Sequence, residues 1–169
     1  MTDNQIKSRL EELSIKAFNF DHKQYREKTG RKFQILRANC QDQTYKQEGK
    51  FANFKAGYST NIDILFVTEE VLNGSPEEFD TILLHELAHC IENSNISSDR
   101  SNEGYDLGKY VYGYSNPATE DYTQHTEEFF FTLAEGCINY QKQSSTFKTA
   151  EEVIKSAMRF DIDESEGYN

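Results

Sequence analysis

One helix constrains the fold more than any other part of the chain, and it lies within SPEEFDTILLHELAHCIEN, residues 75–93. Ser75 is a suitable helix cap, and Pro76 suits the first helical position. Glu78 stands three residues after the serine, where a capping box needs it. Apolar residues recur along one side of this helix: Phe79, Ile82, Leu83, Leu87 and Ile91. We therefore predict a core helix rather than one lying free on the surface.

The same helix carries two histidines one turn apart. His85 and His89 share a face, so their imidazoles can point at a single cation. A catalytic zinc takes three protein ligands in tetrahedral geometry, with nitrogen at about 2.0 Å and water in the fourth position. Glu86 lies about 100° round the helix from His85, where it can act as a general base on that water. The pattern predicts metal-assisted hydrolysis of an amide bond, as in His-Glu-x-x-His peptidases.

A third ligand must come from elsewhere in the chain. The remaining histidines are His22 and His125, and the nearby acidic candidates are Glu120, Asp121, Glu127, Glu128 and Glu135. We expect His125 to open a helix, where packed turns hold its first residues. Glu128 shares its face at i+3, so spacing alone leaves Glu128 open as the ligand or as a carboxylate that orients His125.

Length and composition indicate one folded domain with a polar surface. The chain has 169 residues, 36% of them hydrophobic, and a mean hydropathy of −0.80. Its three cysteines form no C-x-x-C pair that would indicate a thiolate zinc site. No apolar run is long enough to span a membrane and the N-terminus does not resemble a signal peptide, so we expect a cytoplasmic protein. We place the domain at residues 1–160 and expect the acidic segment 161–169 to fray.

Positive charge gathers in one segment of an otherwise acidic chain. The net charge is −11, yet residues 22–58 hold nine lysines and arginines against three acidic residues. A chain this acidic should not coat nucleic acid non-specifically, but the segment can form a basic patch that contacts it. The alternative is an ordinary solvated face.

Short strands and further helices complete an α+β pattern. A first helix is expected from Asp3 to about Phe20, continuing or restarting up to Gly30. Three strands are expected at residues 32–38, 53–59 and 61–67. We predict that this small sheet packs on the N-terminal helix and the histidine helix. The last strand, which contains Asp63, offers an edge that can pair with an extended peptide.

The second half of the chain contains a long segment with little periodicity. From Asn93 to Thr123 we predict a loop, with a hairpin at Lys109–Tyr114, and then helices over Thr123–Gln141 and from Thr149 onward. Five tyrosines fall in this part of the chain: Tyr105, Tyr110, Tyr112, Tyr114 and Tyr122. One of them can donate a hydrogen bond to a developing oxyanion, or their rings can staple the loop to the domain.

Together these residues resemble the SprT-like metallopeptidase domain. The resemblance covers about Lys55 to Gln141 and is carried by GYSTNIDILFVTEEVLNGSPEEFDTILLHELAHCIEN followed by HTEEF. It implies a zincin fold with His85, His89 and His125 on zinc and Glu86 as base. It thus favours His125 over Glu128, although EEFFFTLAEG is also similar to the third-ligand helix of glutamate zincins. It further implies a zinc-dependent endopeptidase acting on protein substrates, with DNA-associated proteins as one class.

Two other functions fit the same residues. The scaffold can be a binding module that retains zinc for stability without proteolysis. It can also hydrolyse a small amide. An intact Glu86 favours the peptidase, because a purely structural zinc needs no base and prefers closed coordination.

Overall fold

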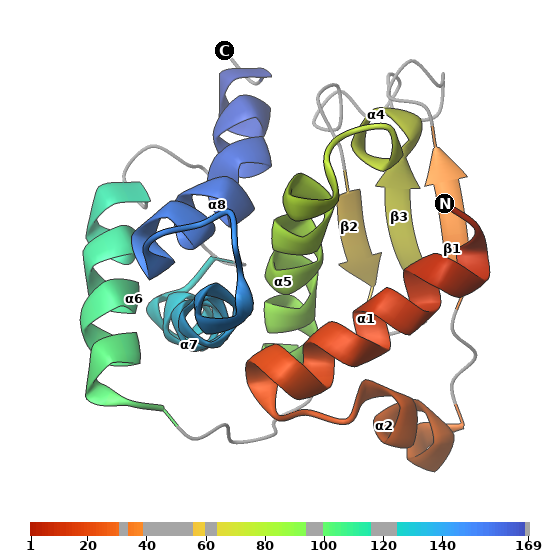
Figure 1. Cartoon of the computed structure of the whole chain (residues 1–169), viewed down its shortest axis with the longest axis horizontal. Coiled ribbons are helices and arrows are strands. Elements are labelled where there is room, and N and C mark those ends of the chain that lie inside the picture. Colours follow the sequence, from red (N-terminus) through yellow and green to blue (C-terminus); the bar gives the residue numbers. More distant parts are fainter. Residues whose placement is uncertain (31–33, 39–55, 60–63, 94–99, 116–124, 168–169) are drawn as a thin grey trace.

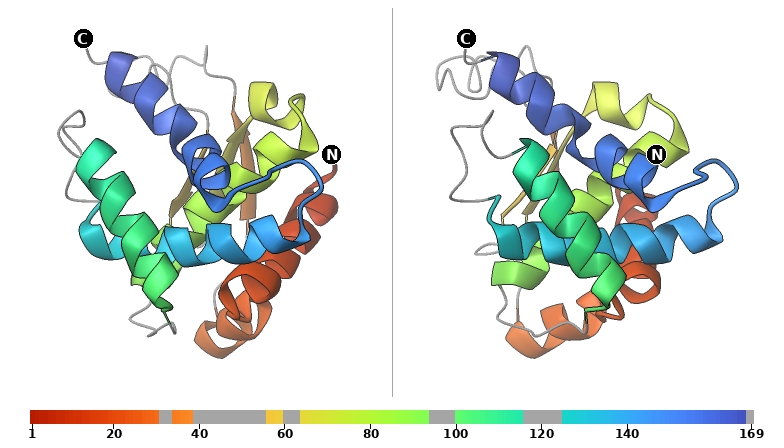
Figure 2. Two further views of the ribbon diagram at one scale, coloured as in Figure 1. Left: turned by 60° about the vertical axis from the view of Figure 1, so that its left-hand side comes forward. Right: turned by 90° about the vertical axis from the view of Figure 1, so that its left-hand side faces the viewer.

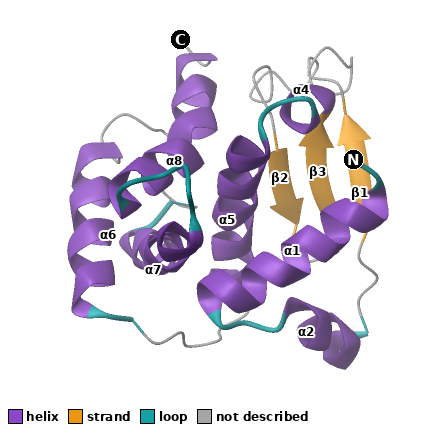
Figure 3. Cartoon of the chain, viewed as in Figure 1, coloured by secondary structure: helices purple, strands orange, loops and turns teal. Residues whose placement is uncertain are grey.

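The computed structural model describes residues 1–30, 34–38, 56–59, 64–93, 100–115 and 125–167. Among these residues, three strands gather on one side of the molecule, and most of the others belong to helices (Figures 1 and 3). The predicted α+β class is confirmed. None of the described helices is long and apolar enough to cross a membrane.

The sheet has the strand order β1-β3-β2. The strands are β1 (Gln34–Ala38), β2 (Ala56–Ser59) and β3 (Ile64–Thr68), close to the predicted ranges. β1 runs parallel and β2 antiparallel to β3. The expectation that the last strand offers a free edge is wrong, because β3 pairs on both sides. Asp63 lies outside the described residues.

Helix α5 (Pro76–Asn93) occupies the centre of the fold. It contacts β2 on one side and α7 and α8 on the other, and α4 (Glu69–Leu72) leads into it (Figures 1 and 2). All residues from Thr81 to Ala88 are buried, as expected for a helix enclosed on every side. The predicted cap is present, since Ser75 Oγ accepts a hydrogen bond from the Glu78 N–H at 3.1 Å.

The N-terminal segment forms two helices, α1 (Asp3–Phe18) and α2 (His22–Thr29), so the first helix restarts rather than continues. The break falls at Asn19, which adopts the left-handed conformation with φ 51°. α1 packs on α5 and α7. A bidentate ion pair supports this packing, with Arg9 Nε and Nη2 donating to the Asp80 carboxylate at 2.7 and 2.6 Å.

The predicted loop over 93–123 is wrong where the structure describes it, because α6 (Asn102–Ser115) is a helix and includes the expected hairpin. Helix α6 packs closely on α7 (Glu127–Gln143). A Cβ added at Gly108 would lie 2.8 Å from the Phe130 carbonyl oxygen, so only glycine permits this approach. Helix α8 (Ala150–Gly167) follows, capped by Thr149 as predicted, and includes residues 161–167.

Candidate metal centre

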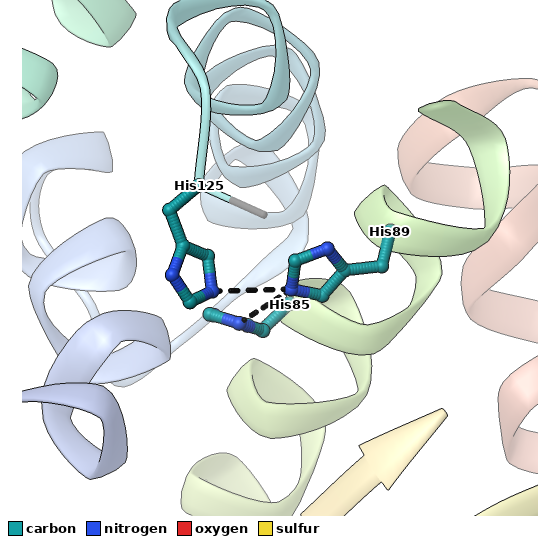
Figure 4. Close-up of side chains that lie close together, drawn as sticks. All are labelled: His85, His89 and His125. Atoms are coloured by element: carbon teal, nitrogen blue, oxygen red, sulfur yellow. Dashed lines mark hydrogen bonds between the residues drawn. The ribbon is translucent and has the colours of Figure 1, made fainter. Parts of the chain in front are cut away.

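Three histidines from two elements meet at one point (Figure 4). His85 and His89 lie one turn apart on α5, and His125 lies just before α7. The Nε2 atom of His89 is 3.2 Å from Nε2 of His85 and 3.2 Å from Nε2 of His125. Zinc–nitrogen bonds of 2.0–2.1 Å in tetrahedral geometry place ligand nitrogens about 3.3 Å apart. The observed spacing therefore fits a single ion, and each histidine supplies one ligand atom within 4.8 Å of the others.

The start of α7 positions His125. The sequence pattern predicts that His125 opens a helix, but α7 begins at Glu127, after His125. Thr126 is the N-cap, and its Oγ1 accepts a hydrogen bond from the Phe129 N–H at 3.2 Å. The cap fixes the direction in which the chain enters α7 and thereby the place of the residue before it.

Burial keeps all three imidazoles neutral at pH 7. It lowers the pKa of His125 to about 4. The pKa values of His85 and His89 also fall well below 6.5, chiefly through burial and secondarily through repulsion between the histidines. A neutral imidazole carries the lone pair that a metal ligand needs.

A backbone carbonyl from α8 orients His85. The Nδ1–H of His85 donates to the carbonyl oxygen of Ala157 at 3.1 Å, which leaves Nε2 with its lone pair directed at the other two histidines. Metal-binding histidines commonly donate their second ring N–H in this way. The sequence carried no sign of this contact, because any residue supplies a carbonyl oxygen.

One aromatic ring contacts all three imidazoles. Phe129, in the first turn of α7, stacks on His89 with ring centroids 4.2 Å apart and planes 20° apart. Its centroid lies 5.1 Å from those of His85 and His125. The ring is 1% exposed and forms an apolar wall beside the nitrogen cluster. In the sequence, Phe129 is the last residue of HTEEF, the segment that carries part of the resemblance.

The predicted base is buried. Glu86 is 3% exposed and follows His85 on α5. The rival ligand lies elsewhere: the Glu128 side chain is 61% exposed, and its carboxylate accepts a hydrogen bond from Arg100 at 2.5 Å. The structure thus brings His125, and not Glu128, to the cluster.

The other candidate ligands have different surroundings. His22 is buried near the N-terminal helices, where its Nδ1 accepts a hydrogen bond from Arg26. Glu135 accepts hydrogen bonds from the N–H and hydroxyl of Ser101, and Glu127 is exposed. Glu120 and Asp121 lie outside the described residues.

Two of the tyrosines that the structure describes in this part of the chain support packing. Tyr105 meets the ring of Phe131 at 4.8 Å and Tyr112 meets Phe130 at 6.0 Å, which joins α6 to α7. Tyr110 is 56% exposed. The side chain of Tyr114 and the whole of Tyr122 lie outside the described part.

Comparison of the chain with known protein families, characterised proteins and solved structures finds no match. The interpretation of the three-histidine cluster therefore depends on its own geometry and chemistry.

Proposed function

We propose that the protein is a zinc-dependent peptidase with a zincin-type centre, in which His85, His89 and His125 hold the metal and Glu86 is the general base. The observation that carries this proposal is the convergence of three neutral imidazole nitrogens at metal-ligand spacing, next to a buried glutamate.

The donor set favours zinc over the harder cations. Calcium and magnesium prefer oxygen ligands, whereas imidazole suits zinc and the later first-row metals. Three protein ligands, rather than four, are the mark of a catalytic zinc site that keeps one position open. The cluster has three members among the described residues.

The mechanism follows from where protons can go. Zinc held by His85, His89 and His125 would supply a Lewis acid that lowers the pKa of the attacking water toward about 7. Glu86 accepts a proton from the water as the water oxygen attacks the peptide carbonyl carbon. It then delivers that proton to the leaving nitrogen. The Ala157 carbonyl and the ring of Phe129 hold His85 and His89 in place meanwhile.

Protein substrates are the broad class that we propose. Action on DNA-associated proteins would involve the basic segment 22–58, of which residues 31–33 and 39–55 lie outside the described part. One of its cations is engaged in the fold, since Arg26 is 7% exposed and paired with Glu11. A cytoplasmic location remains an expectation from sequence.

A Glu86→Gln variant tests the proposal against the binding-module alternative. The amide keeps the size of the carboxylate but cannot accept the proton. We expect zinc content to equal that of the wild type and cleavage of an unfolded protein substrate to fall by at least about 100-fold. If the wild type holds zinc and cleaves no protein or peptide, the binding-module alternative replaces the peptidase.

A further inference from the structure

Arg100 joins the two helices that flank the metal centre. It lies two residues before α6, and its side chain is 14% exposed. Its Nη1 donates to Glu128 of α7 at 2.5 Å, and its Nη2 donates to Glu92 of α5 at 3.2 Å. One guanidinium thus bridges a carboxylate on each helix.

A buried hydroxyl closes this bridge. Thr132 of α7 is fully buried, and its Oγ1 accepts from Arg100 Nη2 at 3.2 Å while donating to Glu92 at 2.5 Å. Arg100, Glu92 and Thr132 therefore contact one another in a closed set. Such charge-assisted hydrogen bonds are stronger than neutral ones and are most effective when water is excluded.

Two hydrogen-bond partners of Arg100 fall one turn from residues that line the candidate metal centre. Glu92 follows His89 by three residues on α5, and Thr132 follows Phe129 by three residues on α7. Residues three apart on a helix share a face. The bridge therefore holds the turn of α5 that carries His89 against the turn of α7 that carries the ring stacked on it.

We propose that Arg100 is a positioning residue for the metal centre, which sets the separation of His89 and His125 by tying α5 to the start of α7. The inference rests on the proposed zinc site. His89 and His125 belong to different elements, so their spacing depends on how α7 is held against α5. The planar fork of arginine can serve two carboxylates at once, which the single ammonium of lysine does less well.

The test compares Arg100→Met with Arg100→Lys and with a matched control, Lys16→Met. Lys16 forms an exposed ion pair with Glu12 on α1. Zinc affinity is measured by competition with a chromophoric chelator, and the visible spectrum of the Co²⁺-loaded protein reports coordination geometry. We expect Arg100→Met to weaken zinc binding by about 10–100-fold and to change the cobalt spectrum, with an intermediate result for Arg100→Lys and none for Lys16→Met.

A milder variant keeps the inference testable if Arg100→Met does not fold. Glu128→Gln changes an exposed side chain and removes one charge of the bridge, and we expect it to weaken zinc binding by up to about tenfold. If zinc affinity and cobalt spectrum in Arg100→Lys and Glu128→Gln both match those of the wild type, Arg100 has no positioning role.

These outcomes separate the inference from the proposed function. A wild type that binds zinc and lacks peptidase activity overturns the peptidase proposal. The zinc affinity and cobalt spectrum of the Arg100 variants still test the positioning role of Arg100. A wild type that binds neither zinc nor Co²⁺ overturns both. An Arg100→Met protein that only unfolds at a lower temperature, with metal affinity and spectrum unchanged, shows a purely structural residue and overturns the inference.

Discussion

Phe129 stacks on His89, with ring centroids 4.2 Å apart and planes 20° apart. The phenyl ring restricts rotation of the imidazole and keeps water from that face. It links the first turn of α7 to His89 on α5, so the packing of the two helices and the position of a proposed ligand depend on the same contact.

Replacing Phe129 with leucine tests this link. The substitution keeps most of the buried volume but loses the stacked face, and we expect the free energy of unfolding to fall by about 1–2 kcal/mol. Zinc affinity should fall by about tenfold, because a ligand loses its support. Chemical denaturation and zinc titration measure the two effects. Phe79→Leu, buried elsewhere on α5, should lower stability without changing zinc affinity.

The packing of α6 on α7 depends on Gly108. A Cβ there would lie 2.8 Å from the Phe130 carbonyl oxygen and 2.9 Å from the Phe131 Cα, so we expect Gly108→Ala to destabilise the protein by about 1–3 kcal/mol. Gly113 is in the same helix and a Cβ there meets nothing within 4 Å. Gly113→Ala should stabilise by about 0.5–1 kcal/mol. Thermal unfolding of the two variants measures this difference. Equal effects of the two substitutions would contradict the close approach of α6 to α7 at Gly108.

His22 makes stability depend on pH. Burial, followed by the nearby charge of Arg26, lowers its pKa from 6.5 to about 3. Between these values the unfolded chain binds a proton that the folded protein does not, so stability is lost as pH falls below about 6.5. In the wild type, His22 should contribute about 1.4 kcal/mol per pH unit to the loss of unfolding free energy as the pH falls. The His22→Gln variant should lack this contribution. Urea denaturation at pH 6, 5 and 4 measures it, and equal slopes would mean that His22 protonates in the fold.

Sequence patterns predicted the centre of the fold best. The capped apolar helix that carries His85 and His89 is present, and so are three strands close to their expected positions. Local rules govern these elements, namely capping and periodicity. The same rules were wrong for α6, whose glycines and tyrosines have modest helix propensity. Its stability comes from close packing on α7 at Gly108, a tertiary effect that composition does not reveal.

The three-histidine cluster was predictable only in part, for a similar reason. Spacing on one helix predicts that His85 and His89 converge. Spacing does not decide whether His125 or Glu128 is the third ligand. Arg100, distant in sequence, engages Glu128, and the cap at Thr126 places His125 at the cluster. The pairing of β3 on both sides likewise depends on strand order, which periodicity does not encode.

The most direct test of the three-histidine centre is the zinc content of purified wild type, His125→Ala and Glu128→Gln after equilibration with excess zinc and removal of weakly bound ions. We predict one zinc per chain in the wild type and in Glu128→Gln, and a loss of most of it in His125→Ala. Zinc retained in His125→Ala and lost in Glu128→Gln, or absent from all three proteins, would contradict the proposed centre.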